Sequence, residues 1–340
     1  MEKTIIPKKH FGQNFLKDSI TLDKILQASS ELYKSCSLEL EAKMREKQAA
    51  DAHLQTQTTR TLEIKSSACA TNADLILGQN KMQPQALLPL QLVEIGVGLG
   101  DLSKRLLSIA PLIAYEIDEA LCSFVLQRFE KENLLEHFDL RQADVLSLPF
   151  VRHLAMRNPQ NQTSWLSAYP YLLVSNLPYY IATRIILTAL KDPLCVGFVI
   201  MTQKEVADKF CATSGDREFC ALSVLAQSAG EIRFLFDVPK EAFNPAPKVT
   251  SSVFSLHKQN LWQNQTPNKQ DLIRHYDFEI LLKSAFASPR KRLFSNLAKQ
   301  YDKSLIEQIF TTLNIAQDTR AHQLAKEDYH HIYQLIKDQQ

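Results

Sequence analysis

The sequence is poor in glycine and cysteine, and it carries no strong excess of charge of either sign. Only 8 of its 340 residues are glycine and 6 are cysteine, and the formal net charge is +2. The cysteines are scattered, with no CxxC pair and no Cys/His spacing, so neither a zinc site nor a disulfide framework is expected. Scattered cysteines are typical of a reducing compartment, and we therefore expect a cytoplasmic protein that binds no metal.

Long apolar runs are also missing. The first ten residues, MEKTIIPKKH, lack the apolar stretch of a signal peptide, and no run approaches the roughly 18 apolar residues that a membrane span needs. We therefore expect no membrane association. Because the net charge is small, a nucleic-acid partner would have to be met by local basic clusters. Two such clusters exist, Lys8-Lys9 and Arg290-Lys291-Arg292, and each could equally be an ordinary solvated surface.

The order of segments predicts two domains. From residue 90 to about 260, short apolar segments such as 171–176 alternate with helix-like segments such as 119–132, and after that only helix-like segments follow. Residues 35–88 are rich in polar residues, and we interpret them as an insertion on the surface rather than part of the core. We predict a large domain over 1–260, with this insertion, and a small all-helical domain over 261–340.

The alternation of strands and helices also predicts the fold class. Strands that alternate with helices are typical of a largely parallel sheet with helices on both faces. We therefore expect an α/β protein with a Rossmann-like sheet, preceded by a helix at 19–34, where apolar residues recur at helical spacing.

A glycine loop follows the first predicted strand of this sheet. In VEIGVGLG, residues 93–100, Gly96 and Gly98 would let the chain turn sharply and let a ligand approach the backbone. The dinucleotide fingerprint GxGxxG fails because Asp101 stands where its third glycine would be. The loop therefore suits a nucleoside ligand without phosphates, although a strand–glycine–helix turn with no ligand is an alternative.

Two acidic residues follow the next predicted strands. Glu116 comes 20 residues after Gly96, the spacing at which an acidic residue accepts hydrogen bonds from ribose hydroxyls, and Asp144 ends the strand after that. The alternatives are an exposed carboxylate at a strand end and a cap of a turn. Three polar sites at the ends of successive strands form a crevice for an adenosine-like cofactor, and S-adenosylmethionine fits this description.

The fourth motif is Asn176-Leu177-Pro178-Tyr179, in the sequence NLPY. An exocyclic amine on a base is a poor nucleophile, and acceptors such as the Asn176 side chain and the Leu177 or Pro178 carbonyl would favour its transition state. Pro178 has no N–H to interfere, and Tyr179 can stack on the base. The alternative is an Asn-x-Pro turn with a packed tyrosine. Because the motif follows a cofactor-type half-sheet, we favour a methyltransferase.

At these residues the sequence resembles the ribosomal RNA adenine N6,N6-dimethyltransferase family, and most closely its bacterial small-subunit branch. The resemblance runs from residue 8 almost to the end and includes KKHFGQNFLKD (8–18), VEIGVGLGDLS (93–103), YEID (115–118), QADVL (142–146), SNLPYYIATRII (175–186), EAFNPAPKV (241–249) and AFASPRKRLFSNL (285–297). The insertions at 35–88 and around 150–170 depart from the family pattern, and they leave the nearby RNA-binding surface undefined.

The resemblance implies a role for each matching residue. The implied cofactor-binding residues are Gln13, Asn14, Leu16, Gly96, Gly98, Glu116, Ile117, Asp144, Val145 and Asn176. The implied catalytic residues are Asn176, Leu177, Pro178, Tyr179 and Phe243, with Tyr179 and Phe243 covering opposite faces of the target adenine. The implied RNA-binding residues are Lys8, Lys9, Lys248, Arg290, Lys291 and Arg292.

The resemblance further implies an activity and a partner. The family's small-subunit enzymes use S-adenosylmethionine to dimethylate N6 of two adjacent adenosines near the 3′ end of 16S ribosomal RNA, in ribosome maturation. We expect a monomer. Three alternatives stay open: an antibiotic-resistance enzyme acting on 23S RNA, a methylase of DNA adenine, and a ribosome assembly factor without activity. SQNFL and NIPYNIS sequences would indicate the antibiotic-resistance enzyme. The absence of cofactor binding would indicate the assembly factor.

Overall fold

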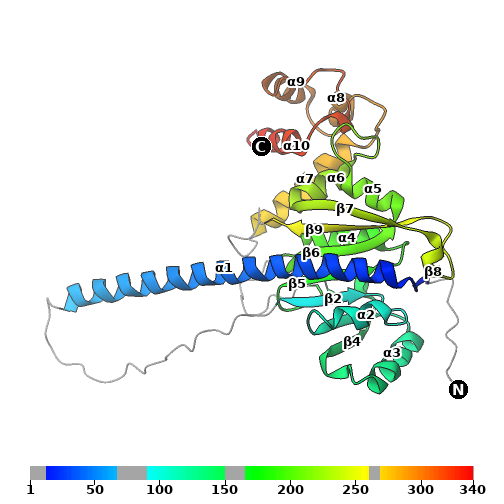
Figure 1. Ribbon diagram of the computed structural model, residues 1–340. Coiled ribbons are helices and arrows are strands. Elements are labelled where there is room, and N and C mark those ends of the chain that lie inside the picture. The colour runs from blue at the N-terminus through cyan, green and yellow to red at the C-terminus, as the bar shows by residue number, and fades with distance from the viewer. Residues whose placement is uncertain (1–12, 67–89, 150–164, 260–268, 340) are drawn as a thin grey trace.

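A computed structural model describes residues 13–66, 90–149, 165–259 and 269–339 (Figure 1). Two of the predicted RNA-binding residues, Lys8 and Lys9, lie outside the described residues, as does part of each predicted insertion. No helix in the described ranges combines the length and the apolar character required to cross a membrane. The same ranges hold no group of three or more His, Cys, Asp or Glu side chains suited to a metal ion.

The centre of the molecule is a seven-stranded sheet with the order β4-β3-β2-β5-β6-β9-β7. Its strands are β2 (Gln91–Ile95), β3 (Leu112–Glu116), β4 (Phe138–Gln142), β5 (Tyr171–Asn176), β6 (Cys195–Gln203), β7 (Gly230–Val238) and β9 (Ser251–Lys258). The first five strands are parallel, which confirms the predicted α/β fold. Strands β9 and β7 add an antiparallel edge that the sequence did not indicate. In β7 only Val238 is fully buried, and Arg233 and Asp237 interrupt the apolar residues.

Helices cover both faces of the sheet. One face packs against α1, α2 (Asp101–Leu106) and α3 (Glu119–Lys131), and the other against α4 (Ala182–Lys191), α5 (Lys204–Cys211) and α6 (Ala221–Ala229). Strand β5 supplies both cores, because successive side chains of a strand point to opposite faces. Leu172 and Val174 enter the first core, whereas Tyr171 and Leu173 enter the second.

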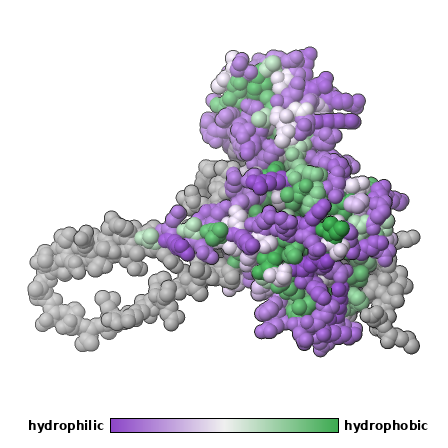
Figure 2. Space-filling view, viewed as in Figure 1, coloured by the Kyte–Doolittle hydropathy of each residue, from purple (hydrophilic) through white to green (hydrophobic). Residues whose placement is uncertain are grey.

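Helix α1 (Ser19–Ser66) is a single long helix, whereas we expected a helix at 19–34 and then a polar insertion, of which 38–54 could form a separate, mostly polar helix. The sequence between these ends contains no glycine or proline to stop it. The start of the predicted insertion belongs to the body: Cys36 is buried with Leu90 and Val196, and His257 Nε2 lies 3.1 Å from Glu39 Oε1. Further along, the helix leaves the body (Figure 1), and Figure 2 shows mainly hydrophilic residues where it does so.

The C-terminal part is helical, and its core also includes Ala212, Phe219 and Val224 from the region of α5 and α6. It contains α7 (Lys269–Ala285), α8 (Leu293–Leu297), α9 (Lys303–Thr312) and α10 (Lys326–Lys337), which stand together above the sheet in Figure 1. The core includes Leu282, Leu293, Phe310 and Tyr329. The predicted boundary at 260–261 falls outside the described residues and stays a prediction.

Short elements complete the chain. Strands β1 (Phe15–Leu16) and β8 (Phe243–Asn244) form a separate antiparallel pair, with Leu16 opposite Phe243. Turns of 3₁₀ helix occur at η2 (Leu135–His137), η3 (Val145–Ser147), η6 (Lys240–Ala242) and η7 (Ala321–Gln323). Strand β1 and η3 both border a cavity at the carboxyl ends of the central strands.

Candidate active site

A cavity of about 430 Å³ lies at the carboxyl ends of the central strands. The chain proceeds outward from β2 to β3 and β4 and then returns to β5 on the other side of β2, so the strand order reverses there. Ligands of open α/β sheets bind at such a switch point, and the volume falls in the usual range for a small-molecule site. All ten predicted cofactor-binding residues line this cavity.

The glycine loop forms one wall and adopts a conformation that other residues rarely reach. Gly96 and Gly98 have φ angles of 79° and 57°. A Cβ atom on Gly98 would approach the Phe15 ring to 3.2 Å, so a side chain there would press on the β1 segment. The Gly98 N–H also donates to Glu116 Oε2 at 3.3 Å, which ties the loop after β2 to the end of β3.

Glu116 is the predicted ribose ligand, and it is held from several sides. The N–H groups of Ile117 and Asp118 both donate to its Oε1 at 2.9 Å. Burial raises the pKa of Glu116, and the backbone N–H groups that it accepts counteract this rise. A fixed, buried carboxylate at the cavity wall can accept hydrogen bonds from a pair of ribose hydroxyls.

A second buried acid, Glu94, was not among the predicted site residues. It lines the cavity, is only 1% exposed, and accepts a hydrogen bond of 2.5 Å from Ser103 Oγ. Burial, with the nearby charge of Glu116, raises the pKa of Glu94 to about 8. The available signal was a charged residue inside an otherwise apolar strand, in the sequence QLVEI.

Asp144 and Val145 form the third wall. Asp144 accepts the Leu146 N–H at 3.0 Å and thus caps η3, so it is a turn cap as well as a cavity residue. The carbonyl of Val145 accepts a hydrogen bond of 2.8 Å from Trp165 Nε1. Trp165 is buried, and it supports this wall from the end of the second insertion. No pattern in the sequence indicated this hydrogen bond.

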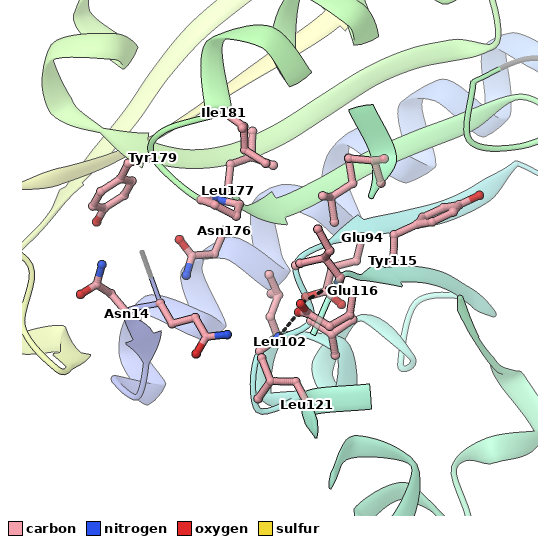
Figure 3. Close-up of a pocket in the computed structure, with 18 of the residues that line it drawn as sticks. Asn14, Glu94, Leu102, Tyr115, Glu116, Leu121, Asn176, Leu177, Tyr179 and Ile181 are labelled. Atoms are coloured by element: carbon pink, nitrogen blue, oxygen red, sulfur yellow. Dashed lines mark hydrogen bonds between the residues drawn. The ribbon is translucent and has the colours of Figure 1, made fainter. Parts of the chain in front are cut away.

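The N-terminal segment closes the cavity from the opposite side. Asn14 and Leu16 line it, and Gln13 Nε2 donates to Asp118 Oδ2 at 3.0 Å. The segment is also held by the pairing of β1 with β8. Figure 3 shows Asn14, Asn176 and Tyr179 on one side of the cavity, with Glu94 and Glu116 on the other.

The NLPY motif follows β5 directly. Asn176 is half-buried at the end of the strand, and the Leu177 N–H donates to Met201 O at 3.0 Å, which fixes the turn to β6. The carbonyl of Pro178 accepts the Ile181 N–H at 3.2 Å. The Asn176 amide therefore faces the cavity on a backbone held by its neighbours, close to Tyr179 in Figure 3.

Tyr179 and Phe243 occupy different environments. Tyr179 lines the cavity, its hydroxyl lies 2.6 Å from Ser251 Oγ, and burial raises its pKa. Phe243 does not line the cavity. It is 2% exposed, and from β8 it packs into the core that includes Leu16 of β1. The structure thus brings together four of the five predicted catalytic residues, and leaves Phe243 behind Leu16, its partner in β1.

Two further residues at the cavity were missed by sequence reasoning. Tyr180 and Arg184 both line it, although they lie in or just beyond the NLPYYIATR sequence that carried the resemblance. Both are exposed. The signal that could have found them was an aromatic and a cation four positions apart, directly after the NLPY motif.

The remaining predicted RNA-binding residues lie away from the cavity. Lys248, Arg290, Lys291 and Arg292 are exposed, and none of them forms an ion pair with another described residue. The three consecutive cations precede α8, and the backbone of Arg292 pairs with that of Arg320. Arg290, Lys291 and Arg292 therefore form an open basic surface on the helical part.

Comparison with known proteins gives one consistent set of relatives. A profile of the family described as "Ribosomal RNA adenine dimethylase" matches residues 73–338. The "Ribosomal RNA small subunit methyltransferase A" of Helicobacter hepaticus is 41% identical over 330 residues, which cover 97% of this chain and 91% of the relative. The same protein name applies to a relative from Sulfurimonas denitrificans, 36% identical over 340 residues, 99% of this chain and 96% of the relative.

Solved structures agree on the fold. A dimethyladenosine transferase from Plasmodium falciparum has a TM-score of 0.58 and 21% identity, and covers 73% of this chain and 92% of its own. At this level of identity the likeness concerns the fold, which is the α/β sheet with its flanking helices.

Proposed function

The chain belongs to the ribosomal RNA adenine dimethylase family, and on that basis we propose that it uses S-adenosylmethionine to dimethylate N6 of two adjacent adenosines near the 3′ end of 16S ribosomal RNA. The observation that carries this proposal is the position of Asn176 and Tyr179 at one side of a cavity. The other walls of this cavity suit an adenosine that carries a positively charged group. The enzyme would act during maturation of the small ribosomal subunit. It would be a monomer in the cytoplasm.

The cavity fits this cofactor by its charge and its shape. S-adenosylmethionine is an adenosine with a cationic sulfonium and an ammonium group. Four acidic residues line the cavity, namely Glu94, Asp101, Glu116 and Asp144. The close backbone of Gly96 and Gly98 leaves room for the amino-acid portion, Glu116 would bind the ribose, and Asp144 with Val145 would hold the adenine. Gln13, Asn14, Leu16 and Ile117 would close the pocket around it.

The chemistry of the transfer requires two partners in line. When bound, S-adenosylmethionine would supply a methyl group from its cationic sulfur: the S–CH3 bond would break as the N6 nitrogen of adenine forms the new N–C bond. S-adenosylhomocysteine would leave as the neutral thioether, and one N6 proton would pass to water. The side-chain oxygen of Asn176 and the carbonyl of Leu177 would accept hydrogen bonds from the amine. These acceptors favour the tetrahedral nitrogen of the transition state, and the fixed backbone of the motif preserves their alignment.

The base itself would be held by stacking. The half-buried ring of Tyr179 lines the cavity, and stacking on an aromatic ring contributes about 1–3 kcal/mol per base. Phe243 would cover the other face only after a rearrangement of the β1–β8 pair, since its ring is buried here. Lys8, Lys9, Lys248 and the Arg290–Arg292 surface would contact phosphates and position the RNA.

The relatives favour a small-subunit substrate over the alternatives. The two relatives described above carry the name "Ribosomal RNA small subunit methyltransferase A", whereas ErmE, a 23S rRNA methyltransferase, is 20% identical with a TM-score of 0.52 and shares the fold alone. The acidic and amide residues of the cavity are all present, which argues against an assembly factor that has lost its activity.

The deciding experiment is mass spectrometry of nucleosides from RNA incubated with the protein and S-adenosylmethionine. Under-methylated small subunits and large-subunit RNA are offered separately, with the Asn176→Ala variant as the inactive control. We expect N6,N6-dimethyladenosine only from small subunits and only with the wild-type protein. Methylation of large-subunit RNA instead would establish the resistance activity, and no methylation with retained small-subunit binding would establish an assembly factor.

A further inference from the structure

Tyr180 is a large aromatic side chain left open at the cavity. It is 59% exposed, whereas Tyr115, a cavity residue on the β3 side, is 4% exposed. The hydroxyls of Tyr115 and Tyr179 are bound, to Leu166 O at 2.6 Å and to Ser251 Oγ at 2.6 Å. Within the described residues the Tyr180 hydroxyl makes no hydrogen bond. Tyr180 is therefore not a core residue, and more than half of its surface is open to a ligand.

The charges of the cavity single out Arg184. Among the described residues that line it, four are acidic and only Arg184 is a cation. Asp101 is already paired with Arg128 at 2.9 Å, whereas the exposed Arg184 forms no ion pair in the part of the chain that the structure describes. An acidic wall attracts a cationic cofactor but repels a phosphate. Arg184 is thus the one point of the lining where a phosphate would be attracted.

The two side chains are arranged to act together. Tyr180 lies in the turn that opens α4, and Arg184 lies in the first turn of the helix, four positions later. The first hydrogen bond of the helix runs from Ile185 N to Ile181 O at 3.0 Å, so Tyr180 lies just before the helix. Both side chains nevertheless line the same cavity. Tyr180 also directly follows Tyr179, the ring assigned to the target base.

We propose that Tyr180 and Arg184 form a subsite for the nucleotide directly next to the target adenosine, with its base on the Tyr180 ring and its phosphate on Arg184. This inference rests on the proposed function. Because the proposed substrate contains two adjacent adenosines, the same subsite holds one of them while the other is in the cavity. The subsite determines which nucleotide of the strand enters the cavity. It recognises single-stranded RNA by stacking, which tolerates different bases.

The test compares three variants, Tyr180→Ala, Tyr180→Phe and Arg184→Gln. With small subunits as substrate, we expect Tyr180→Ala to lower kcat/KM roughly 5- to 100-fold, the range of one base stack. Tyr180→Phe keeps the ring and should stay within about twofold of wild type. Arg184→Gln should lower kcat/KM and reduce the slope of log affinity against log salt by about the value of one phosphate contact. The affinity for S-adenosylmethionine should stay unchanged in all three.

Matched controls come from elsewhere on the surface. Tyr169 is 41% exposed and does not line the cavity, so Tyr169→Ala controls for the loss of an exposed ring. Lys131 is an exposed cation at the end of α3, and Lys131→Gln controls for the removal of a positive charge. Neither control should alter kcat/KM.

A second readout keeps the inference separate from the proposed function. The nucleotide beside the target in a short single-stranded RNA is replaced by 2-aminopurine, whose fluorescence is quenched when it stacks. Quenching by the wild-type and Tyr180→Phe proteins but not by Tyr180→Ala would support the subsite even if no methylation occurs. Equal quenching by all three would overturn it. A loss of cofactor affinity as large as the loss in kcat/KM would overturn it too, because Tyr180 would then cover the cofactor.

Discussion

The hydroxyl of Tyr179 lies 2.6 Å from Ser251 Oγ, although the two residues are 72 positions apart. Ser251 is fully buried at the start of β9, two strands away from β5. The bond therefore connects the turn that carries the NLPY motif to the antiparallel edge of the sheet. Since the Tyr179 ring lines the cavity, this hydrogen bond sets the plane on which a base would stack.

A double-mutant cycle at this pair tests the connection. Tyr179→Ala should lower kcat/KM roughly 10- to 100-fold, because the ring on which the base stacks is removed. Tyr179→Phe and Ser251→Ala should each cost about 3- to 10-fold, the usual net value of one hydrogen bond. The double variant Tyr179→Phe/Ser251→Ala should cost no more than either single one. Strictly multiplicative effects would mean that Ser251 does not position the ring.

Glu116 gives a prediction about cofactor binding. Glu116→Gln keeps an acceptor oxygen but removes the charge, and we expect the Kd for S-adenosylmethionine to rise roughly 10- to 100-fold, the usual effect of removing a hydrogen bond to a charged group. Calorimetric titration measures this effect. Glu130→Gln, at an exposed acid of α3, is the matched control and should leave the Kd unchanged. An unchanged Kd in Glu116→Gln would show that the ribose assignment is wrong.

The basic surface before α8 gives a prediction about RNA. Arg290, Lys291 and Arg292 are exposed and form no ion pair with a described residue. Their stepwise replacement by glutamine should weaken small-subunit binding and reduce the salt slope by roughly 0.7–0.9 for each phosphate that the protein no longer neutralises. Cofactor affinity should not change. A triple variant with the wild-type salt slope would mean that this surface does not meet phosphate.

The sequence was sufficient to predict that several of the candidate cofactor-binding residues meet at one cavity, for a topological reason. Parallel strands end at one edge of a sheet, so residues that follow successive strands, such as Gly96, Glu116 and Asp144, had to meet there. Short-range patterns were sufficient, because each residue is placed by its own strand. The helices expected after residue 260 include α10 (Lys326–Lys337), whose apolar positions repeat at helical spacing.

Contacts between distant segments could not be predicted in this way. Phe243 is buried because β8 pairs with β1 across more than 200 residues, and Trp165 supports Val145 from beyond an insertion. Residues from 35 onward were interpreted as a polar surface insertion, although they continue helix α1 and Cys36 has apolar partners on the sheet. In each case the deciding partner is remote in the sequence and leaves no periodic signal.

The last prediction concerns Glu94, whose side chain is buried between Ser103 on α2 and Glu116 on β3. Burial raises the pKa of Glu94 from an ordinary value of 4.5 to about 8. Between these pH values Glu94 is mostly protonated in the folded protein and mostly ionised in the unfolded chain. The unfolded state then binds fewer protons than the folded state, and stability must fall as the pH rises from about 4.5 to 8. Above about 8 both states are ionised, and this contribution levels off.

Glu94→Gln removes this dependence, because its amide resembles the protonated acid at every pH. Relative to wild type, the free energy of unfolding of the variant should increase from pH 5 to pH 8, by at most about 1.4 kcal/mol per pH unit. Urea unfolding of the cofactor-free protein at several pH values measures this difference, and the exposed Glu130→Gln should show no such trend. Saturating S-adenosylmethionine should reduce the trend, because a cationic ligand favours ionised Glu94, whereas uncharged-sulfur S-adenosylhomocysteine should reduce it less. A pH-independent difference between Glu94→Gln and wild type would mean that Glu94 is ionised in the folded protein throughout.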